Sequence, residues 1–265
     1  MMVEQKIDNI ETLIHELNTF PSHYIYRGQA DASWGIQSSL ERNIGDNFSK
    51  LQAVKYEEFS LQHFKSKFHL YDRENILPVS KLAWLSIMQH YGVPTRLIDF
   101  TESPYVAIYF ALETYSPHSE NDFSVYAIDY RATMKQSLAA ISDHDKDFKE
   151  TYESLYDKHD SVFEDYVDRY SYNILWITEP NQMNIRLDRQ AGSFLLSGNS
   201  GERVETLMAS STYDTVDIRK LTIDHSLYKS VFALLKKMNI TSKSLYGDLD
   251  GLARAIRMEL QVRSV

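Results

Sequence analysis

The chain has 265 residues, of which 43% are hydrophobic and 25% charged, and a formal net charge of -9 at pH 7. This composition is typical of a globular protein, and the length allows one large core or two small ones, of which we favour a single domain. The acidic balance disfavours broad, sequence-independent nucleic-acid binding, which needs a basic surface. The absence of cysteine excludes disulfides, thiolate catalysis and cysteine-ligated metal. No stretch approaches the ~18 uninterrupted apolar residues of a membrane span, and the first residues lack the features of a signal peptide. We therefore expect a cytoplasmic protein with no membrane partner.

The first elements alternate between helix and strand. Apolar residues at helical spacing from Ile7 to Leu17 predict a helix within residues 1–20, which Pro21 bounds. The elements expected next are a strand over residues 24–27 and helices over about 50–68 and 81–90.

The segment after these helices is rich in turn-forming and polar residues. Gly92 and Pro94 should end the helix over 81–90, and an apolar run around Asp99 reads as a short strand. Ser103 and Pro104 then read as the N-cap and first residue of another helix. Because the first N–H groups of a helix lack intrahelical partners, a phosphate could dock at this junction of Thr101, Glu102 and Ser103. The alternative is that Ser103 only caps the helix and Asp99 only anchors a turn.

The second half is predicted to complete the sheet and add helices. Residues 123–129 read as a strand, and the acidic segment 140–170 reads as a helical insert with a solvated face. Strands over 172–177 and 193–196 should place Gln190 beside the start of the second one. Residues 224–265 should form C-terminal helices, one of them with Leu252, Ile256 and Leu260 at helical spacing. Asp248 to Gly251 lack the remaining ligands of a calcium loop and read as a helix cap.

Motifs for metals and common nucleotides are absent. None of the nine histidines is spaced at i and i+4, and no His-x-His occurs, so no metal site is predicted. Neither G-x-x-x-x-G-K nor G-x-G-x-x-G occurs, which excludes the usual P-loop and Rossmann sites. A dinucleotide would need another scaffold.

Residues 50–81 are the best candidate for a nucleic-acid or acceptor surface, because cations alternate there with aromatic rings. The alternative is an amphipathic helix with a solvated lysine face. The residues concerned are Lys50, Lys55, Lys65, Lys67, Arg73 and Lys81, with Phe59, Phe64, Phe68, His63 and His69.

Four ordered motifs together resemble the FRG domain, a bacterial and phage family named for its aromatic-Arg-Gly motif. They are YRGQ at 26–29, QHYGVPTRLIDFTESPYVAIYFAL at 89–112, the segment 180–194 with Arg186 and QAGSF, and SLYGDLDGL at 244–252. The resemblance implies a single FRG domain over residues 1–265. It also implies a context of growth arrest or phage defence, with an antitoxin or immunity protein as a partner.

A more distant resemblance is to ADP-ribosyltransferases of the Arg-Ser-Glu type. Residues 26–28 match their aromatic-Arg-Gly strand, and residues 99–101, followed by Ala107 and residues 110–111, match the spacing of their second strand and helix. Asp99 and Thr101 stand where that pattern has serines, and the closing Glu-x-Glu is replaced by residues 189–194, with Glu202 and Glu205 further on. The fold class implied is α+β, with a small mixed or antiparallel sheet surrounded by helices, and the cofactor implied is NAD, used as a substrate.

The chemistry expected is ADP-ribosyl transfer to a nucleic acid or protein. Nicotinamide leaves NAD as a neutral group, so the site must mainly stabilise an oxocarbenium-like ribose, which a carboxylate can do. The alternatives are NAD hydrolysis without transfer and a non-catalytic module that binds nucleic acid or protein. The expected catalytic residues are Arg27, Asp99, Thr101, Glu102 and Gln190, and the expected NAD-binding residues are Tyr26, Arg27, Gly28, Gln29, Thr95, Arg96, Ser103 and Tyr105.

Three geometric expectations follow from these roles. Arg27, as a partly exposed, ligand-facing side chain, should contribute little to packing; the alternative is a structural ion pair. The backbone at Gly28 should approach the nicotinamide amide, since glycine has no side chain in the way. One cleft should collect Arg27, Thr95, Arg96, Asp99, Thr101 and Gln190.

Overall fold

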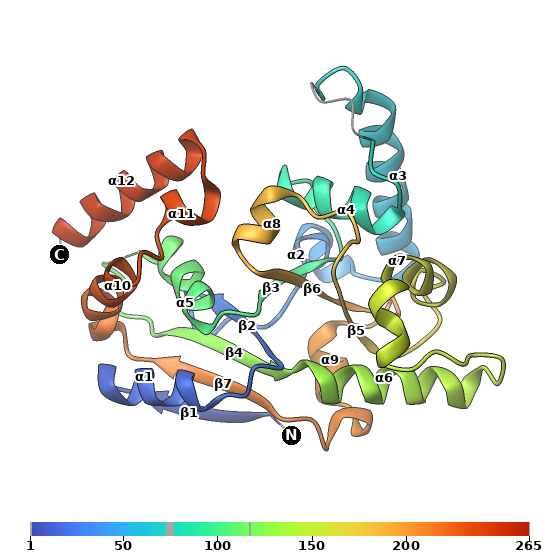
Figure 1. The fold of residues 1–265 in the computed structure, drawn as a ribbon, viewed down its shortest axis with the longest axis horizontal. Helices are drawn as coiled ribbons and strands as arrows, with labels where there is room; N and C mark the ends of the chain where they lie inside the picture. The colour runs from blue at the N-terminus through green and yellow to red at the C-terminus, as the bar shows by residue number, and fades with distance from the viewer. Residues whose placement is uncertain (1, 73–76, 117, 265) are drawn as a thin grey trace.

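One seven-stranded mixed sheet organises the chain in the computed structural model, which describes residues 2–72, 77–116 and 118–264 (Figure 1). The strand order is β1-β7-β4-β2-β3-β6-β5. β1 and β7 pair in parallel, and the other neighbours are antiparallel. The strands are β1 (Val3–Ile7), β2 (Tyr24–Gln29), β3 (Ile98–Thr101), β4 (Phe123–Asp129), β5 (Leu175–Thr178), β6 (Gly192–Ser197) and β7 (Ile218–Ile223). The predicted α+β class, with a sheet surrounded by helices, is confirmed.

Helices cover both faces of this sheet. Because side chains alternate along a strand, β2 sends Ile25 into one apolar cluster and Tyr24 and Tyr26 into the other. The first cluster includes side chains of α3, α4, α6 and α9, and the second includes those of α1, α5, α10 and α11. The longer helices are α1 (Ile10–Thr19), α3 (Lys50–Phe68), α4 (Lys81–His90), α5 (Pro104–Glu113), α6 (Tyr130–His144), α10 (Tyr228–Lys237) and α12 (Leu249–Arg263). The shorter ones are α2 (Ser39–Ile44), α7 (His159–Val162), α8 (Ile185–Arg189), α9 (Val204–Met208) and α11 (Ser242–Tyr246).

Local signals placed several helix ends correctly. Gly92, just beyond α4, has a φ of +79°, which glycine adopts easily. The Ser103 side chain accepts the backbone N–H of Val106, and Asp248 accepts that of Gly251, so both act as the predicted N-caps. The helices over 50–68 and 81–90 are confirmed at both ends.

Three features differ from the sequence prediction. Beyond α6, the acidic segment forms short 3-10, α and π turns in place of one insert helix. The pair β1 and β7 was not predicted. α12 packs through Gly251, Ala255 and Met258, so its apolar row of Leu252, Ile256 and Leu260 is exposed.

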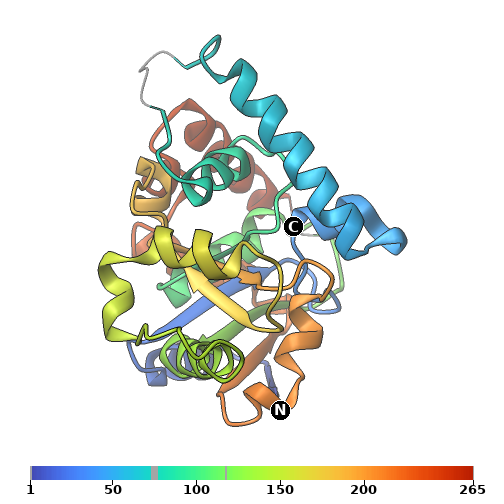
Figure 2. The same ribbon diagram turned by 90° about the vertical axis from the view of Figure 1, so that its right-hand side faces the viewer.

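Two further observations concern the surface. Figure 2 shows α3 running along one side of the molecule, and its Phe59 side chain is exposed. Across the described residues, every helix is either too short or too polar to cross a membrane.

Candidate functional site

The sheet opens between its two central motif strands. β2 and β3 share a single residue pair, Tyr26 with Thr101, whereas β2 and β4 stay paired along the whole of β2. Beyond that pair, Arg27 donates from Nη1 to the backbone oxygen of Asp99 at 2.7 Å. The arginine therefore bridges the opening where ladder hydrogen bonds are missing.

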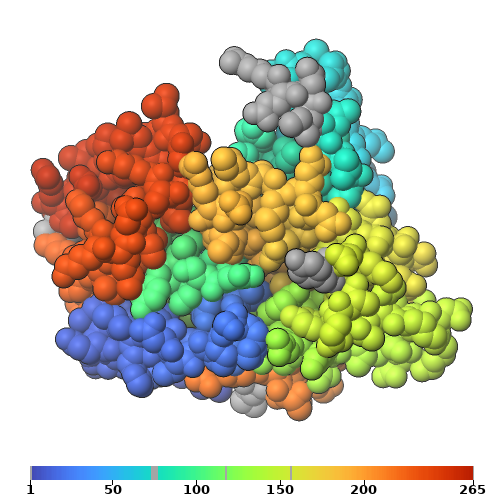
Figure 3. All heavy atoms as spheres, viewed as in Figure 1, coloured from blue at the N-terminus to red at the C-terminus, as the bar shows by residue number. Residues whose placement is uncertain are grey.

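A pocket of about 300 Å³ lies at this opening. Its walls come from β2, β3, β6, α4, the C-terminal end of α5, α8, α11 and α12. In Figure 3 the C-terminal helices (red) and the segment around α8 (gold) lie side by side, in agreement with the contact between α11 and α8. Residues from all four sequence motifs thus meet at one place.

Half of the predicted site residues line this pocket. They are Tyr26, Arg27, Gly28, Asp99, Thr101 and Gln190. The predicted residues outside its lining are Gln29, Thr95, Arg96, Glu102, Ser103 and Tyr105.

The polar groups of the lining are held by neighbours. Asp99 accepts a hydrogen bond from Gln89 Nε2 at 3.0 Å. Thr101 Oγ1 donates to the backbone oxygen of Gln190 at 2.7 Å, which ties β3 to the turn before β6. Gln190 Nε2 is 3.5 Å from the backbone oxygen of Leu245. The pocket is therefore preorganised by contacts among its own motifs.

Arg27 has structural contacts in addition to its predicted role. Its Nε is fully buried without a hydrogen-bond partner among the described residues. Burial lowers the pKa of the guanidinium, with the charge of Asp99 acting in the opposite direction. Arg27 is partly exposed and faces the pocket as expected, but it also joins β2 to β3; that it contributes little to packing stays a prediction.

Gly28 has a structural role that the sequence did not predict. A Cβ there would overlap the backbone oxygen of Ala107 and lie 2.8 Å from the backbone nitrogen of Ala111, both on α5. Glycine is therefore required because α5 presses against β2. Helix backbone fills the space on the Cβ side of Gly28, and the expected approach of a nicotinamide amide to the Gly28 backbone stays a prediction.

Arg96 lies in a separate, compensated ion cluster. Its side chain is paired with Glu57 (3.2 Å) and Asp168, and Lys81 pairs with the same two carboxylates at 3.7 and 2.8 Å. The Arg96 guanidinium carbon lies 4.5 Å from the ring centroid of Tyr170. We call these residues, Glu57, Lys81, Arg96, Asp168 and Tyr170, the Arg96 cluster. The prediction that Arg96 shares the cleft of Arg27 is wrong.

Thr95 and Gln29 support the site from outside it. Thr95 is fully buried and donates from Oγ1 to Gln89 Oε1 at 2.8 Å, which orients the amide that binds Asp99. Gln29 donates to the backbone oxygen of Gly35 at 3.0 Å. Neither side chain is placed to contact a ligand in the pocket.

The N-terminal end of α5 is not the anion site predicted for it. Thr101 Oγ1 accepts the backbone N–H of Ser103, Ser103 Oγ accepts that of Val106, and the N–H of Glu102 bonds to Ala191. The pocket contacts the other end of α5, at Phe110, Glu113 and Thr114. Tyr105 is turned away and bonds to Asn18.

Glu102 lies in a carboxylate pair outside the pocket. β3 and β5 are both antiparallel to β6, so Glu102 and Glu179 follow strands that end at the same edge of the sheet. Burial, reinforced by the charge of Glu102, raises the pKa of Glu179 to about 7. Glu205, beyond the closing motif, instead accepts the backbone N–H of Ile36.

The pocket also contains residues that the sequence reasoning did not assign to it. Arg186 was quoted only as part of a motif. No sequence pattern assigned a role to several other lining residues, although some of them lie inside the quoted motifs. Among these are Ser86, His90, Glu113, Tyr246 and Arg254.

The predicted basic surface over 50–81 is only partly a free surface. Lys81 belongs to the Arg96 cluster, and Lys65 lies over the Trp84 ring at 5.2 Å. Lys50, Lys55 and Lys67 are exposed, whereas Arg73 lies outside the described residues.

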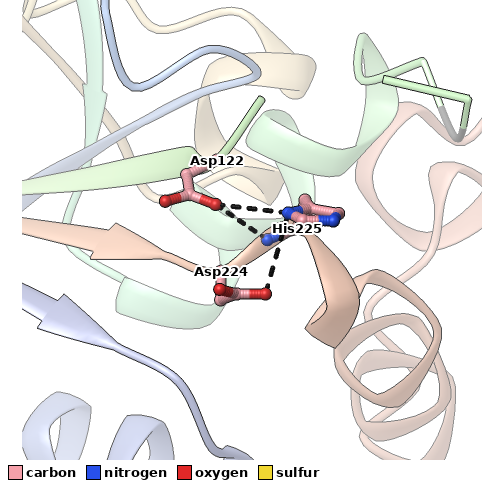
Figure 4. Close-up of side chains that lie close together, drawn as sticks. All are labelled: Asp122, Asp224 and His225. Carbon is pink, nitrogen blue, oxygen red and sulfur yellow. Dashed lines mark hydrogen bonds and ion pairs between the residues drawn. The ribbon is translucent and has the colours of Figure 1, made fainter. Parts of the chain in front are cut away.

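A small group elsewhere could be mistaken for a metal site. Asp122, Asp224 and His225 have ligand atoms within 4.8 Å of one another (Figure 4). However, Asp122 accepts the backbone N–H of His225, Asp224 caps the turn at Ser226, and Lys6 lies 3.4 and 3.8 Å from the two carboxylates. These contacts account for the group without an ion.

Comparison with known families gives one match. No curated protein and no solved structure matches the chain. The family model described as FRG domain matches residues 22–120, which include β2, α4, β3 and α5. The segment that builds the opening of the sheet and about half of the pocket lining is therefore similar to the FRG domain family.

Proposed function

We propose that the pocket binds NAD and that the protein is an ADP-ribosyltransferase acting on a macromolecular acceptor. The observation that carries this proposal is the position of Arg27 and Asp99 on either side of the opening between β2 and β3. The helix with Ala107 and Ala111 packs directly against Gly28. The strand with Arg27, the strand with Asp99 and the helix with Ala107, which together resemble the transferases, are thus in contact with one another. Because all four sequence motifs line the same pocket, we also propose that the FRG domain extends over the whole chain.

The size and charge of the pocket suit such a ligand. A volume of about 300 Å³ falls at the lower end of the range of small-molecule sites. Three arginines and two carboxylates line it, so it carries excess positive charge in a chain of net charge -9. A dinucleotide brings a negatively charged diphosphate together with aromatic rings, for which Phe110 and Phe194 offer apolar wall.

Asp99 is the residue we assign to the developing positive charge on ribose. It is exposed at the pocket and held by one neutral amide, that of Gln89. Arg27 is near enough for the two charges to interact, but no ion pair among the described residues engages the Asp99 carboxylate. A carboxylate held in this way can stabilise an oxocarbenium-like centre. Gln190, in the turn between α8 and β6, would hold the acceptor or the ribose hydroxyls.

The acceptor and the biological setting extend the same proposal. The exposed lysines Lys50, Lys55 and Lys67 are the candidate surface for a nucleic-acid or protein acceptor. We place the activity in the cytoplasm, as a toxin or phage-defence effector controlled by an antitoxin or immunity protein.

A non-catalytic recognition module is the second candidate. It is favoured by the engagement of both pocket carboxylates, since Glu113 is bonded to Tyr109 and Tyr246 and Asp99 to Gln89. NAD hydrolysis without transfer would use the same residues.

Nicotinamide release from NAD tests the proposal. The purified protein is assayed with and without cellular RNA, DNA and protein, alongside Asp99→Asn and the control Asp143→Asn, which alters an exposed carboxylate on α6. We expect turnover that falls roughly a hundredfold or more in Asp99→Asn, because an electrostatic contact to the transition state is lost, and that is unchanged in the control. Full turnover by Asp99→Asn, or loss of turnover on replacing Glu202 or Glu205, would place the carboxylate elsewhere. Binding of NAD without any nicotinamide release would favour the recognition module.

A further inference from the structure

One part of the pocket wall is formed by α8, α11 and α12, which follow Arg27 and Asp99 much later in the chain. We propose that this part, built from Arg186, Tyr246 and Arg254, is a binding subsite for a diphosphate group. The proposal rests on the proposed function only in identifying that group as the diphosphate of NAD.

Arg186 is a pocket arginine without an acidic partner. Within the described ranges no carboxylate pairs with its guanidinium and no hydrogen bond holds it; its contact is with the ring of Tyr246. By contrast, Arg254 pairs with Asp250 and Glu113, and Arg219 pairs with Asp217. In an acidic chain an unpaired, half-buried guanidinium facing a pocket is the group most available to an anion.

Tyr246 holds Arg186 in position. The guanidinium carbon of Arg186 lies 4.3 Å from the ring centroid of Tyr246, and that of Arg254 lies 4.7 Å from it. Stacking on a ring orients a guanidinium while leaving its N–H groups free to donate in the plane. The fork of Arg186 is therefore free to bind the oxygens of a diphosphate, whereas Arg254 is already engaged by Asp250 and Glu113 and lies over the same ring.

The tyrosine is itself anchored. Its hydroxyl donates to Glu113 Oε2 at 2.7 Å, while Tyr109 donates to Glu113 Oε1 at 2.9 Å and Arg254 lies 3.4 Å from the same oxygen. This network fixes the ring before any ligand arrives, which reduces the entropy lost on binding.

Another wall of the pocket carries an independent observation that points to a polar ligand. Ser86 of α4 lines the pocket and is 3% exposed, yet its Oγ has no partner among the described residues. Buried hydroxyls are nearly always hydrogen-bonded, so an unsatisfied one in a pocket wall is available to a polar ligand group. His90 lies one turn further along α4. Burial, and then the charge of Arg186, lowers the pKa of His90, with the charge of Asp248 acting in the opposite direction.

Calorimetric titration tests the subsite. Inorganic pyrophosphate, ADP and ADP-ribose are titrated at low ionic strength into the wild-type chain and into Arg186→Ala and Arg186→Lys. The matched control is Arg257→Ala, which removes the same charge from the exposed face of α12, and thermal unfolding checks that each variant is folded. We expect the wild type to bind all three probes, Arg186→Ala to bind each of them roughly ten- to a hundredfold more weakly, and the control to match the wild type. Arg186→Lys should recover only part of the loss, since lysine cannot donate as a planar fork.

Two results would overturn the subsite. One is no binding of any probe by the wild type, and the other is equal binding by Arg186→Ala. The outcomes also separate this proposal from the proposed function. Pyrophosphate binding through Arg186 without nicotinamide release would keep the subsite and reject the transferase. Nicotinamide release with an unchanged KM for NAD in Arg186→Ala would do the reverse.

Discussion

The Arg96 cluster and the pocket both contain arginine, tyrosine and carboxylate, but they differ in how charge is balanced. In the Arg96 cluster, two cations share Glu57 and Asp168. In the pocket, Arg186 has a ring beneath it and no carboxylate partner in the described part of the chain. α4 connects the two regions, because Lys81 at its start belongs to the cluster and Ser86 lies in the pocket wall.

This contrast separates structural charges from ligand-binding ones. A buried charge without a partner costs several kcal/mol, so a folded chain keeps its internal ions paired. An unpaired arginine is tolerated where solvent or a ligand can reach it. The pairing of each motif arginine therefore says more about its role than its presence in the motif does.

Breaking the cluster should have the largest effect. We expect Arg96→Ala to destabilise the fold by about 3–5 kcal/mol, because Glu57 is 1% exposed and would lose its closest cation. Urea denaturation measures the loss. Arg96→Lys, which keeps the charge but loses the guanidinium fork, should recover part of it. Equal stability of Arg96→Ala and the wild type would show that Lys81 alone balances both carboxylates.

Gly28→Ala should have the next largest effect on stability. It tests whether the motif that carries Arg27 also packs β2 against α5. The added methyl group meets helix backbone, which cannot rotate away, so we expect a loss of about 1–3 kcal/mol from overpacking. The control is Gly201→Ala, where the new Cβ comes no closer than 3.0 Å to a neighbour, the side chain of Lys50. A Gly28→Ala variant with unchanged stability would mean that α5 can shift away from β2.

The sequence predicted the ends of the helices better than it predicted the pairing of the strands. The ends of α3 and α4 and the caps at Ser103 and Asp248 follow from local residue preferences. β1 and β7 pair across more than two hundred residues, and no local pattern indicates such a partner.

The same limit applies to the site residues. Arg96 and Asp99 are three residues apart, but only long-range contacts decide that Arg96 meets Asp168, 72 residues away, while Asp99 faces the pocket. Glu102 follows Thr101 directly but lies outside the pocket, where its backbone N–H bonds to Ala191 and its charge acts on Glu179. Motif membership thus located the site but could not assign each residue to it.

Glu179 is a carboxylate without a cationic partner in the described part of the chain, and its replacement should change the stability less than the two variants above. Its folded-state pKa of about 7 lies above the usual 4.5, so the protonated form stabilises the fold below pH 4.5 and this contribution is lost as the pH rises through 7. Glu179→Gln should match the wild type at pH 4.5 and exceed its stability at pH 8, by on the order of 1 kcal/mol because the group is partly exposed.

Thermal unfolding across this pH range measures the difference. Glu102→Gln should reproduce part of the gain by removing the second carboxylate, whereas Glu120→Gln, at an exposed position, should leave the pH profile unchanged. A constant difference between Glu179→Gln and the wild type from pH 4.5 to 8 would contradict the shifted pKa.

Ser86→Ala should give the smallest change in stability and the sharpest distinction between folding and binding. Removing a buried hydroxyl that has no partner relieves a desolvation cost, and alanine favours a helix interior, so we expect a gain of about 0.5–1 kcal/mol. The same variant should bind ADP-ribose more weakly, since the ligand would lose a hydrogen bond. Ser137→Ala is the matched control, because that helical serine is also buried but bonds to the backbone oxygen of Leu175 and to Tyr213, and its removal should destabilise the fold. If Ser86→Ala instead lowered stability and left ADP-ribose binding intact, Ser86 would be satisfied within the fold, and the pocket would lose its independent sign of a polar ligand.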